Sequence, residues 1–502
     1  MLELLDGGRK PGGAPAETGP ASALLVDLNA RLEAAAGTQD PKARLGALGQ
    51  LQDTGAAPCA ALLAQYLFPH AGTHAGREVL WASLLGYQTR LTQALCAAAG
   101  ASLTLLGAAR ALRAIRALAK LHLVHYAAVP GRLWRVAYAI HAGAEKAGFA
   151  TTPVHAQADH RAATTVEQEL LRLVMLRVSA PDMMPPEQVE VADRVVEHLG
   201  AEFTLRQPGV ADNPFCYEPA AEHPPRRARG RELPDTTRYF GPGMGYESLE
   251  RIARQFGGAK PADFRAFGND IAPRVQLGAV NHLLAFWRVD APYVPPEHSP
   301  ASGSLEVVHG YAQVWQHASQ PAQAAGGLSL ADYAGPPQPP ETWEVRGKGG
   351  SELGVEVPPA SRAWAKCGTL LGLSTGDGER WTGLIRRMHP RADGGLQADI
   401  AVLSRAPRAT ELREVIGKYD DGAVTEAVAR QFGTAGVKAV ILADGGDGAQ
   451  PANLLVPSDH WSAGGVYELQ QGDASRYLRT TQAVRHGEDY VRATFEWVAG
   501  PG

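Results

Sequence analysis

The spacing of the apolar residues changes once along the chain, near Ser302, and this change constrains the fold more than any other feature. Before it, large apolar residues recur every three or four positions, as in Leu25, Leu28 and Leu32, which places one apolar stripe along a helix. After it, short apolar runs are separated by glycine-rich turns, the pattern of β-strands. The sequence therefore predicts an α+β fold: an all-α helical N-terminal half followed by an antiparallel β-barrel and a further β-rich C-terminal region.

Both halves can be divided into elements, because Gly and Pro mark the breaks between apolar segments. Helical spacing is found from residue 21 onward and in the stretches 45–67, 77–98, 103–126, 133–147, 166–178, 186–199, 247–256 and 262–287. Strands are expected at 305–309, 354–357, 369–373, 381–385, 398–403, 437–442, 466–469 and 490–495. We expect consecutive antiparallel helices, in either a bundle or a short solenoid, and no residue pattern recurs among them at a fixed period.

These elements suggest a division of the chain into six parts. We expect a disordered tail at 1–20, a helical domain at 21–205, a Pro/Arg-rich linker at 206–240, a helical segment at 241–300, a barrel region at 301–410 and a C-terminal β-rich region at 411–502. The linker is predicted from its many Pro residues and from the basic run that begins at Arg226.

Composition and charge exclude several classes of protein. With 48 Lys and Arg against 52 Asp and Glu, the formal net charge is −4, which gives no general reason to expect nucleic-acid binding. The four cysteines (Cys59, Cys96, Cys216 and Cys367) are far apart, so neither a disulfide framework nor a zinc site is predicted. The N-terminus lacks the order of a signal peptide and no stretch has the length of a membrane span. We therefore expect a cytoplasmic protein.

No catalytic residue and no metal-ligand set is predicted. The sequence around Ser351 lacks the second glycine of a G-x-S-x-G nucleophile elbow, because Leu353 stands there. The glycine-rich stretch 241–245 is not followed by Lys-Ser/Thr, so a turn before a helix is favoured over a phosphate loop. His70 and His74 share helical spacing but have no carboxylate at ligand spacing. An enzyme and a resident cofactor are therefore not expected.

One segment of the β-rich half carries a family resemblance. The stretch 343–357 reads Trp-Glu-Val-Arg-Gly-Lys-Gly-Gly-Ser-Glu-Leu-Gly-Val-Glu-Val and resembles a PilZ domain, whose second motif is Asp/Asn-x-Ser-x-x-Gly. Ser351 and Gly354 match that motif, while Gly349 stands in the Asp/Asn position. The whole chain is similar to long PilZ-containing bacterial proteins with a helical N-terminal half. PilZ domains are small β-barrels that act as cyclic-di-GMP receptors, so the resemblance implies a regulatory protein with this nucleotide as its ligand.

The resemblance also implies which residues would bind the nucleotide. Ser351 and Gly354 would place the backbone against the ligand, and Arg346, Lys348, Arg386 and Arg387 would contact phosphate or guanine. Arginine suits this chemistry because its guanidinium makes bidentate contacts to phosphate and to guanine. No catalytic and no metal-binding residue is implied.

A second PilZ motif, Arg-x-x-x-Arg before the first barrel strand, has no counterpart at that place. Residues 289–345 contain no Lys or Arg but several acidic residues, and the nearest Arg-x-x-x-Arg, Arg227 to Arg231, lies far upstream. A field of that sign repels a dianion, so ligand binding is expected to be weak or lost. The alternative interpretation is a protein-interaction scaffold that has a protein partner and no nucleotide ligand.

Overall fold

The computed structural model describes residues 20–68, 76–156, 163–207, 213–228, 233–256, 267–290, 298–319, 339–415, 436–442, 453–471 and 474–499. The chain divides into two compact units. The helical unit is Met1–His122, Val129–Val178 and Val196–Tyr246, and the barrel unit is Leu123–Ala128, Ser179–Val195 and Glu247–Gly502. The tail expected at residues 1–20 lies outside the described residues except for Pro20.

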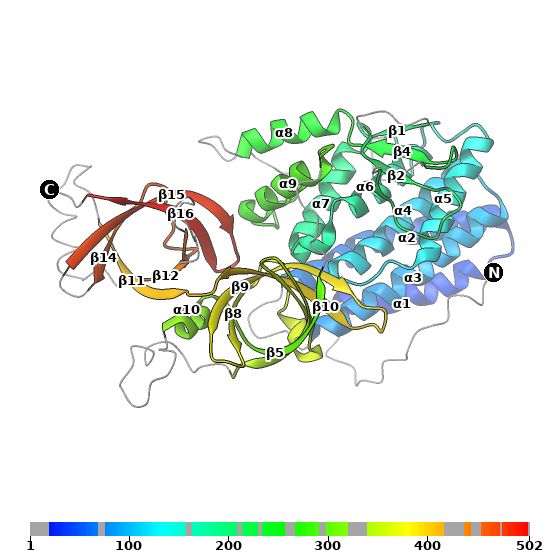
Figure 1. The fold of residues 1–502 in the computed structure, drawn as a ribbon. Helices are drawn as coiled ribbons and strands as arrows, with labels where there is room; N and C mark the ends of the chain where they lie inside the picture. The colour runs from blue at the N-terminus through cyan, green and yellow to red at the C-terminus, as the bar shows by residue number, and fades with distance from the viewer. Residues whose placement is uncertain are drawn as a thin grey trace. The chain divides into compact units, whose positions relative to one another are not determined.

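The N-terminal helices confirm the helical periodicity of the sequence (Figure 1). They are α1 (Pro20–Ala36), α2 (Pro41–Leu67), α3 (Arg77–Ala101), α4 (Leu105–Val124), α5 (Gly131–Lys146), α6 (Val166–Val178) and α7 (Pro186–Leu199). The start of α2 shows why these bounds arise: Asp40 accepts a hydrogen bond from Ala43 N at 2.7 Å, and Pro41 occupies the first helical position, where its missing N–H costs nothing. No helix in the described ranges is long and apolar enough to cross a membrane.

A small antiparallel sheet completes the helical unit. Its strands are β1 (Thr204–Arg206), β2 (Phe215–Tyr217), β3 (Arg226–Arg227) and β4 (Arg238–Gly241), in the order β1-β4-β2-β3. Tyr217 stacks on Tyr138 of α5 with ring centroids 4.4 Å apart, which ties this sheet to the helices. The stretch 206–240, expected to be a linker, therefore contains most of a packed sheet.

The barrel unit contains three further helices and a first closed barrel. The helices are α8 (Gly245–Phe256), α9 (Pro273–Trp287) and α10 (Tyr311–Ser319). The barrel strands are β5 (Ser299–His309), β6 (Glu341–Gly349), β7 (Glu352–Val357), β8 (Leu370–Thr375), β9 (Arg380–Pro390) and β10 (Leu396–Ser404). They pair antiparallel in the closed order β10-β7-β6-β5-β8-β9. The predicted antiparallel barrel is thus confirmed, with six strands.

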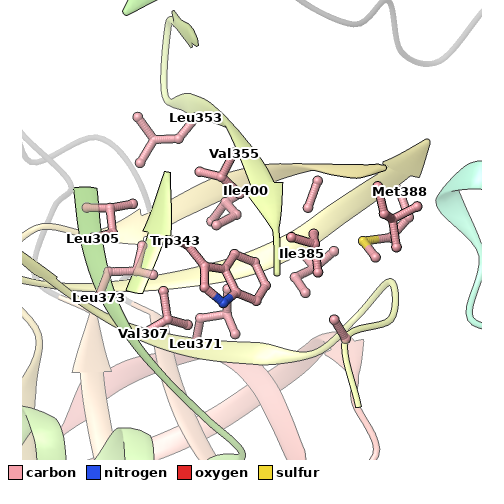
Figure 2. Close-up of a cluster of buried hydrophobic side chains, with 14 of the residues drawn as sticks. Leu305, Val307, Trp343, Leu353, Val355, Leu371, Leu373, Ile385, Met388 and Ile400 are labelled. Carbon is pink, nitrogen blue, oxygen red and sulfur yellow. The ribbon is translucent and has the colours of Figure 1, made fainter. Parts of the chain in front are cut away.

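The interior of this first barrel is filled by side chains from every strand (Figure 2). Trp343, Val355, Leu373, Ile385 and Ile400 are each buried completely. On β6 buried and exposed residues alternate, because successive side chains of a strand point to opposite faces of the sheet. Glu344, Arg346 and Lys348 of β6 therefore face outward and are exposed.

A second closed barrel follows, which the sequence indicated only as a β-rich region. Its strands are β11 (Arg408–Glu414), β12 (Val437–Leu442), β13 (Asn453–Pro457), β14 (Val466–Gln471), β15 (Ala474–His486) and β16 (Tyr490–Val498), in the order β11-β12-β13-β16-β15-β14. Its core includes Leu412, Leu454 and Leu478, all fully buried. The chain is therefore an α+β protein with two antiparallel six-stranded barrels.

Helix α10 packs between the two barrels (Figure 1). Tyr311 and Trp315 of α10 share one buried cluster with Leu370 of the first barrel and Leu455 of the second. Trp315 Nε1 donates to Thr410 O at 3.2 Å. Burial of two large aromatic side chains contributes several kcal/mol, so α10 holds the barrels in a defined arrangement within the barrel unit.

Candidate functional site

The predicted ligand-contacting turn joins β6 to β7 on the surface of the first barrel. Gly350 has φ +58°, a conformation that glycine adopts without the strain of a side chain. Ser351 follows it and is exposed, and its carbonyl accepts a hydrogen bond from Val402 N at 2.9 Å. The turn is therefore fixed by a hydrogen bond from strand β10 of the same barrel, and the Ser351 hydroxyl faces solvent.

Two glycines beside this turn are covered by His298. Gly347 and Gly354 pair directly across β6 and β7. A Cβ at Gly347 would lie 2.8 Å from His298 Cβ, and a Cβ at Gly354 would lie 3.3 Å from His298 Nδ1 and 3.2 Å from Gln397 Nε2. The close packing explains glycine at Gly347 and favours it at Gly354. It also means that His298, and not open solvent, lies over Gly354.

Arg346, a predicted ligand contact, forms an ion pair on the outer face of the barrel. Its Nη2 lies 2.8 Å from Glu356 Oε2, and Arg391 contacts the same carboxylate. Hydrogen bonds from Arg346 and then Arg391 lower the pKa of Glu356 below its usual range. A phosphate bound by Arg346 would therefore compete with a carboxylate that is ionised at neutral pH.

The other predicted cations differ in their contacts. Arg386 Nη1 lies 2.8 Å from Glu352 Oε1, and Arg387 Nε lies 2.6 Å from Asp182 Oδ2. Lys348 lies on β6 and is exposed. The barrel thus brings together Arg346, Lys348, Ser351 and Gly354 on β6, β7 and their turn. Each of the three arginines already contacts a carboxylate.

A buried carboxylate close to this site gave no signal in the sequence. Asp399 on β10 pairs in register with Gly354 and with Arg387, and its side chain is 3% exposed. Its oxygens lie 3.9 Å from His298 Nδ1 and 4.0 Å from His389 Nδ1. Burial raises the pKa of Asp399, although both histidines oppose this shift. Only the strand register brings these residues together, so no local motif could have indicated the cluster.

A small open pocket lies at the other end of β5. It has a volume of about 280 Å³ and is lined by Val307, Val308, His309, Pro339, Pro340, Glu341 and Trp364. His309 stacks on Trp364 with ring centroids 3.7 Å apart. Glu341 accepts hydrogen bonds from Trp364 Nε1 at 3.1 Å and Trp343 Nε1 at 3.3 Å, so its carboxylate is engaged within the pocket wall.

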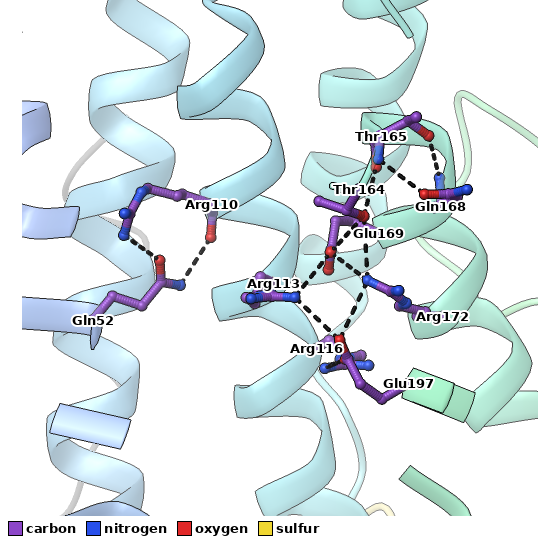
Figure 3. A network of polar contacts seen from close by, with 10 residues as sticks. All are labelled: Gln52, Arg110, Arg113, Arg116, Thr164, Thr165, Gln168, Glu169, Arg172 and Glu197. Carbon is purple, nitrogen blue, oxygen red and sulfur yellow. Dashed lines mark hydrogen bonds and ion pairs between the residues drawn. The ribbon is translucent and has the colours of Figure 1, made fainter. Parts of the chain in front are cut away.

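A second polar cluster is buried in the helical unit (Figure 3). Arg113 of α4 contacts Glu169 at 3.3 Å and Glu197 at 3.1 Å, and Arg172 of α6 contacts the same two carboxylates at 2.6 and 3.4 Å. Arg116 is paired with Glu197. Burial alone would raise the pKa of Glu197, but the three arginines hold it at about 2. The cluster links α4, α6 and the C-terminal end of α7.

The arginine stripe on α4 continues to a third arginine. Arg110 makes a two-pronged contact with Asp53 of α2, at 3.2 and 3.0 Å, and donates to Gly49 O at 2.8 Å. A Cβ at Gly49 would lie 2.8 Å from the guanidinium carbon, so glycine is required for this approach. Local spacing in the sequence does not indicate the partners of these arginines, because the partners lie on other helices.

Within the described ranges, no group of three or more His, Cys, Asp or Glu side chains could hold a metal ion. His70 and His74 lie outside the described residues. The cysteines Cys59, Cys96, Cys216 and Cys367 are all free.

Part of the chain matches a known protein family. Residues 14–209 match the model of a family described as "Cyclic-di-GMP receptor FimW, N-terminal domain". This part of the chain is therefore similar to the N-terminal domain of a receptor for that nucleotide. No curated protein matches the chain, and no solved structure matches it. The matched region contains the buried arginine cluster of the helical unit and ends before the barrels.

Proposed function

We propose that the chain is a non-enzymatic regulatory protein that binds cyclic di-GMP on its first barrel. The similarity of residues 14–209 to the N-terminal domain of a cyclic-di-GMP receptor carries this proposal. The PilZ-like motif lies in a different part of the chain and independently suggests the same nucleotide. Ser351 and Gly354 lie in and beside an ordered turn at the surface of a six-stranded barrel, which supports a ligand contact at this turn.

The predicted arginines suit this ligand, but each must first leave its carboxylate partner. Cyclic di-GMP carries two phosphates and two guanines, and arginine contacts both groups in bidentate fashion. Arg346 and Arg386 are 52% and 40% exposed, so each can turn from its carboxylate toward a ligand. The exchange of one ion pair for another gains little free energy, and binding at Arg346, Lys348, Arg386 and Arg387 is therefore weak.

Calorimetric titration of the full chain with cyclic di-GMP tests the proposal. We expect the heat of binding to saturate as cyclic di-GMP is added. Arg346→Ala should bind the nucleotide with lower affinity, because this variant lacks one ligand contact. Arg479→Ala is the matched control, because Arg479 is a half-exposed arginine paired with Glu496 on the second barrel. No heat at high micromolar nucleotide would remove the receptor function.

The second candidate is an interaction scaffold without a nucleotide ligand. It is favoured by one observation, the carboxylate partners of Arg346, Arg386 and Arg387. Such a protein would bind one stoichiometric protein partner equally well with and without cyclic di-GMP. Sedimentation of the complex in both conditions distinguishes the two functions.

A further inference from the structure

A single imidazole covers two glycines of the first barrel. Gly347 and Gly354 are direct partners across β6 and β7, and such partners present the same face of a sheet. A Cβ at Gly347 would lie 2.8 Å from His298 Cβ, and one at Gly354 would lie 3.3 Å from Nδ1 and 3.5 Å from Cε1 of the same ring. The bare backbone at both positions is therefore what allows a planar ring to lie here.

The ring of His298 fits this place, but its hydrogen bonding does not. His298 Nδ1 lies 3.9 Å from Asp399 Oδ1, which is too far for a hydrogen bond. Both His298 Nε2 and Asp399 Oδ1 are buried without a hydrogen-bond partner among the described residues. A buried acceptor without a donor costs free energy, so a group that donates to Asp399 would stabilise this arrangement.

A second polar side chain of β10 lies at the same place. Gln397 and Asp399 are two residues apart, so their side chains project from one face of the strand. Asp399 pairs in register with Gly354, and Gln397 Nε2 would lie 3.2 Å from a Cβ at Gly354. A carboxylate that accepts and an amide that donates therefore both lie beside the glycine that the His298 ring covers.

The edge of a guanine base carries the complementary groups. Its N1–H and N2–H₂ donors are adjacent, and its O6 acceptor follows them on the same edge. A carboxylate has two oxygens and can accept from two adjacent N–H groups, while the side-chain amide of glutamine can donate to O6. Guanine is also planar, as imidazole is, so it suits a surface that is bare backbone at Gly347 and Gly354.

We propose that Asp399 and Gln397 bind the edge of one guanine of cyclic di-GMP, and that the His298 ring occupies this base site until the nucleotide displaces it. The inference rests on the proposed function and deepens it, because it assigns residues to a base and not to a phosphate. Displacement of the ring is easy, since no hydrogen bond joins it to Asp399.

The test compares His298→Ala and Asp399→Ala in calorimetric titrations of the full chain. One ligand is cyclic di-GMP, and the other is its analogue with hypoxanthine in place of guanine, which lacks the N2–H₂ donor. The controls are His460→Ala and Asp459→Ala, because these two side chains of the second barrel are 50% and 79% exposed. Both controls should bind as the unchanged protein does.

The two variants should change the affinity in opposite directions. We expect His298→Ala to bind cyclic di-GMP about three- to tenfold more tightly, because the base no longer has to displace a ring. Asp399→Ala should bind it at least about tenfold more weakly, because a hydrogen bond to a charged acceptor is lost. It should also lose the preference of the unchanged protein for cyclic di-GMP over the analogue. A folding defect would weaken binding in both variants, so it cannot produce this result.

The outcomes separate the base site from the receptor function. If the unchanged protein and both variants bind cyclic di-GMP equally well, the base site is wrong and the receptor function stands. If His298→Ala binds more weakly, His298 is a ligand contact and not an occupant of the site, and the inference is wrong. If only His298→Ala binds, the base site is right and the unchanged protein is not a receptor. If no form of the protein binds at high micromolar nucleotide, both proposals fall.

Discussion

Arg386 on β9 donates to Glu352 on β7 over 2.8 Å, although the arginine side chain is 40% exposed and the glutamate side chain only 4%. A buried carboxylate thus holds a cation that faces solvent. The arrangement keeps Arg386 available at the surface while restraining it away from a ligand. In the proposed function, a phosphate that binds Arg386 therefore has to compete with Glu352.

Replacement of this carboxylate should strengthen nucleotide binding. In Glu352→Gln the neutral amide competes less for Arg386, and we expect the affinity for cyclic di-GMP to rise about three- to tenfold, the equivalent of one modest hydrogen bond. The cost in the free energy of unfolding should be about 1 kcal/mol, because one partner is well exposed. Calorimetry and urea unfolding measure the two effects. The control Glu496→Gln removes an exposed acid from the second barrel and should change neither the nucleotide affinity nor the free energy of unfolding. Unaltered or weaker nucleotide binding in Glu352→Gln would contradict the competition between Glu352 and phosphate for Arg386.

The buried cluster of the helical unit should make the free energy of unfolding depend on pH in the acid range. Three arginines hold the pKa of Glu197 at about 2, below its ordinary 4.5. Because the folded pKa lies below the unfolded one, the stabilisation is complete above about pH 4.5 and is lost as the pH falls toward 2. A depression of this size corresponds to about 3 kcal/mol at neutral pH.

Glu197→Gln tests this coupling. We expect the variant to be less stable at pH 7 by about 3 kcal/mol, and the difference from the unchanged protein to shrink as the pH falls below 4.5. Urea unfolding followed by helical circular dichroism at several pH values measures it. Glu33→Gln in α1 supplies a matched glutamate control at an exposed helix position. A difference that is constant with pH would show that the charge of Glu197 is not the source.

Alanine substitutions at three glycines of the first barrel should lower the free energy of unfolding by different amounts. A Cβ at Gly347 would come within 2.8 Å of His298 Cβ, and one at Gly354 within 3.2 Å of the Gln397 side chain, whereas one at Gly376 would meet nothing within 4 Å. Gly347→Ala should therefore cost about 1–3 kcal/mol as an overpacked site, Gly354→Ala less, and Gly376→Ala close to zero. Urea unfolding of the three variants gives the order, and an equal cost at all three positions would contradict it.

The sequence was sufficient to predict many of the elements and the first barrel, but not the closure of the second barrel. The bounds of α6 and α7 and of β12 agree with the apolar spacing to the residue, because each has a strong periodic pattern between turn residues. Helix α10 and strand β15 were missed. The first is a short helix within a β-rich half, and the second has few buried positions among its thirteen residues, so periodicity was weak in both.

The candidate site was only half visible in the sequence, for a different reason. Ser351 and Gly354 belong to one local motif and could be found by their spacing. Asp399 lies beside His298 only because the barrel closes. Such contacts depend on strand pairing over long separations, which composition and local spacing do not specify. The carboxylate partners of the predicted arginines were hidden for the same reason.

The aromatic residues of α10 should determine whether the two barrels unfold together. Trp315 is 3% exposed and lies in the cluster that both barrels share, so Trp315→Ala should cost about 3–5 kcal/mol and split the thermal unfolding of the barrel unit into two transitions. Trp497, which is 42% exposed on the second barrel, is the matched control, and Trp497→Ala should cost less than about 1 kcal/mol. Differential scanning calorimetry of both variants measures the effect. If Trp315→Ala lowers the melting temperature but leaves a single sharp transition, α10 contributes stability without coupling the barrels.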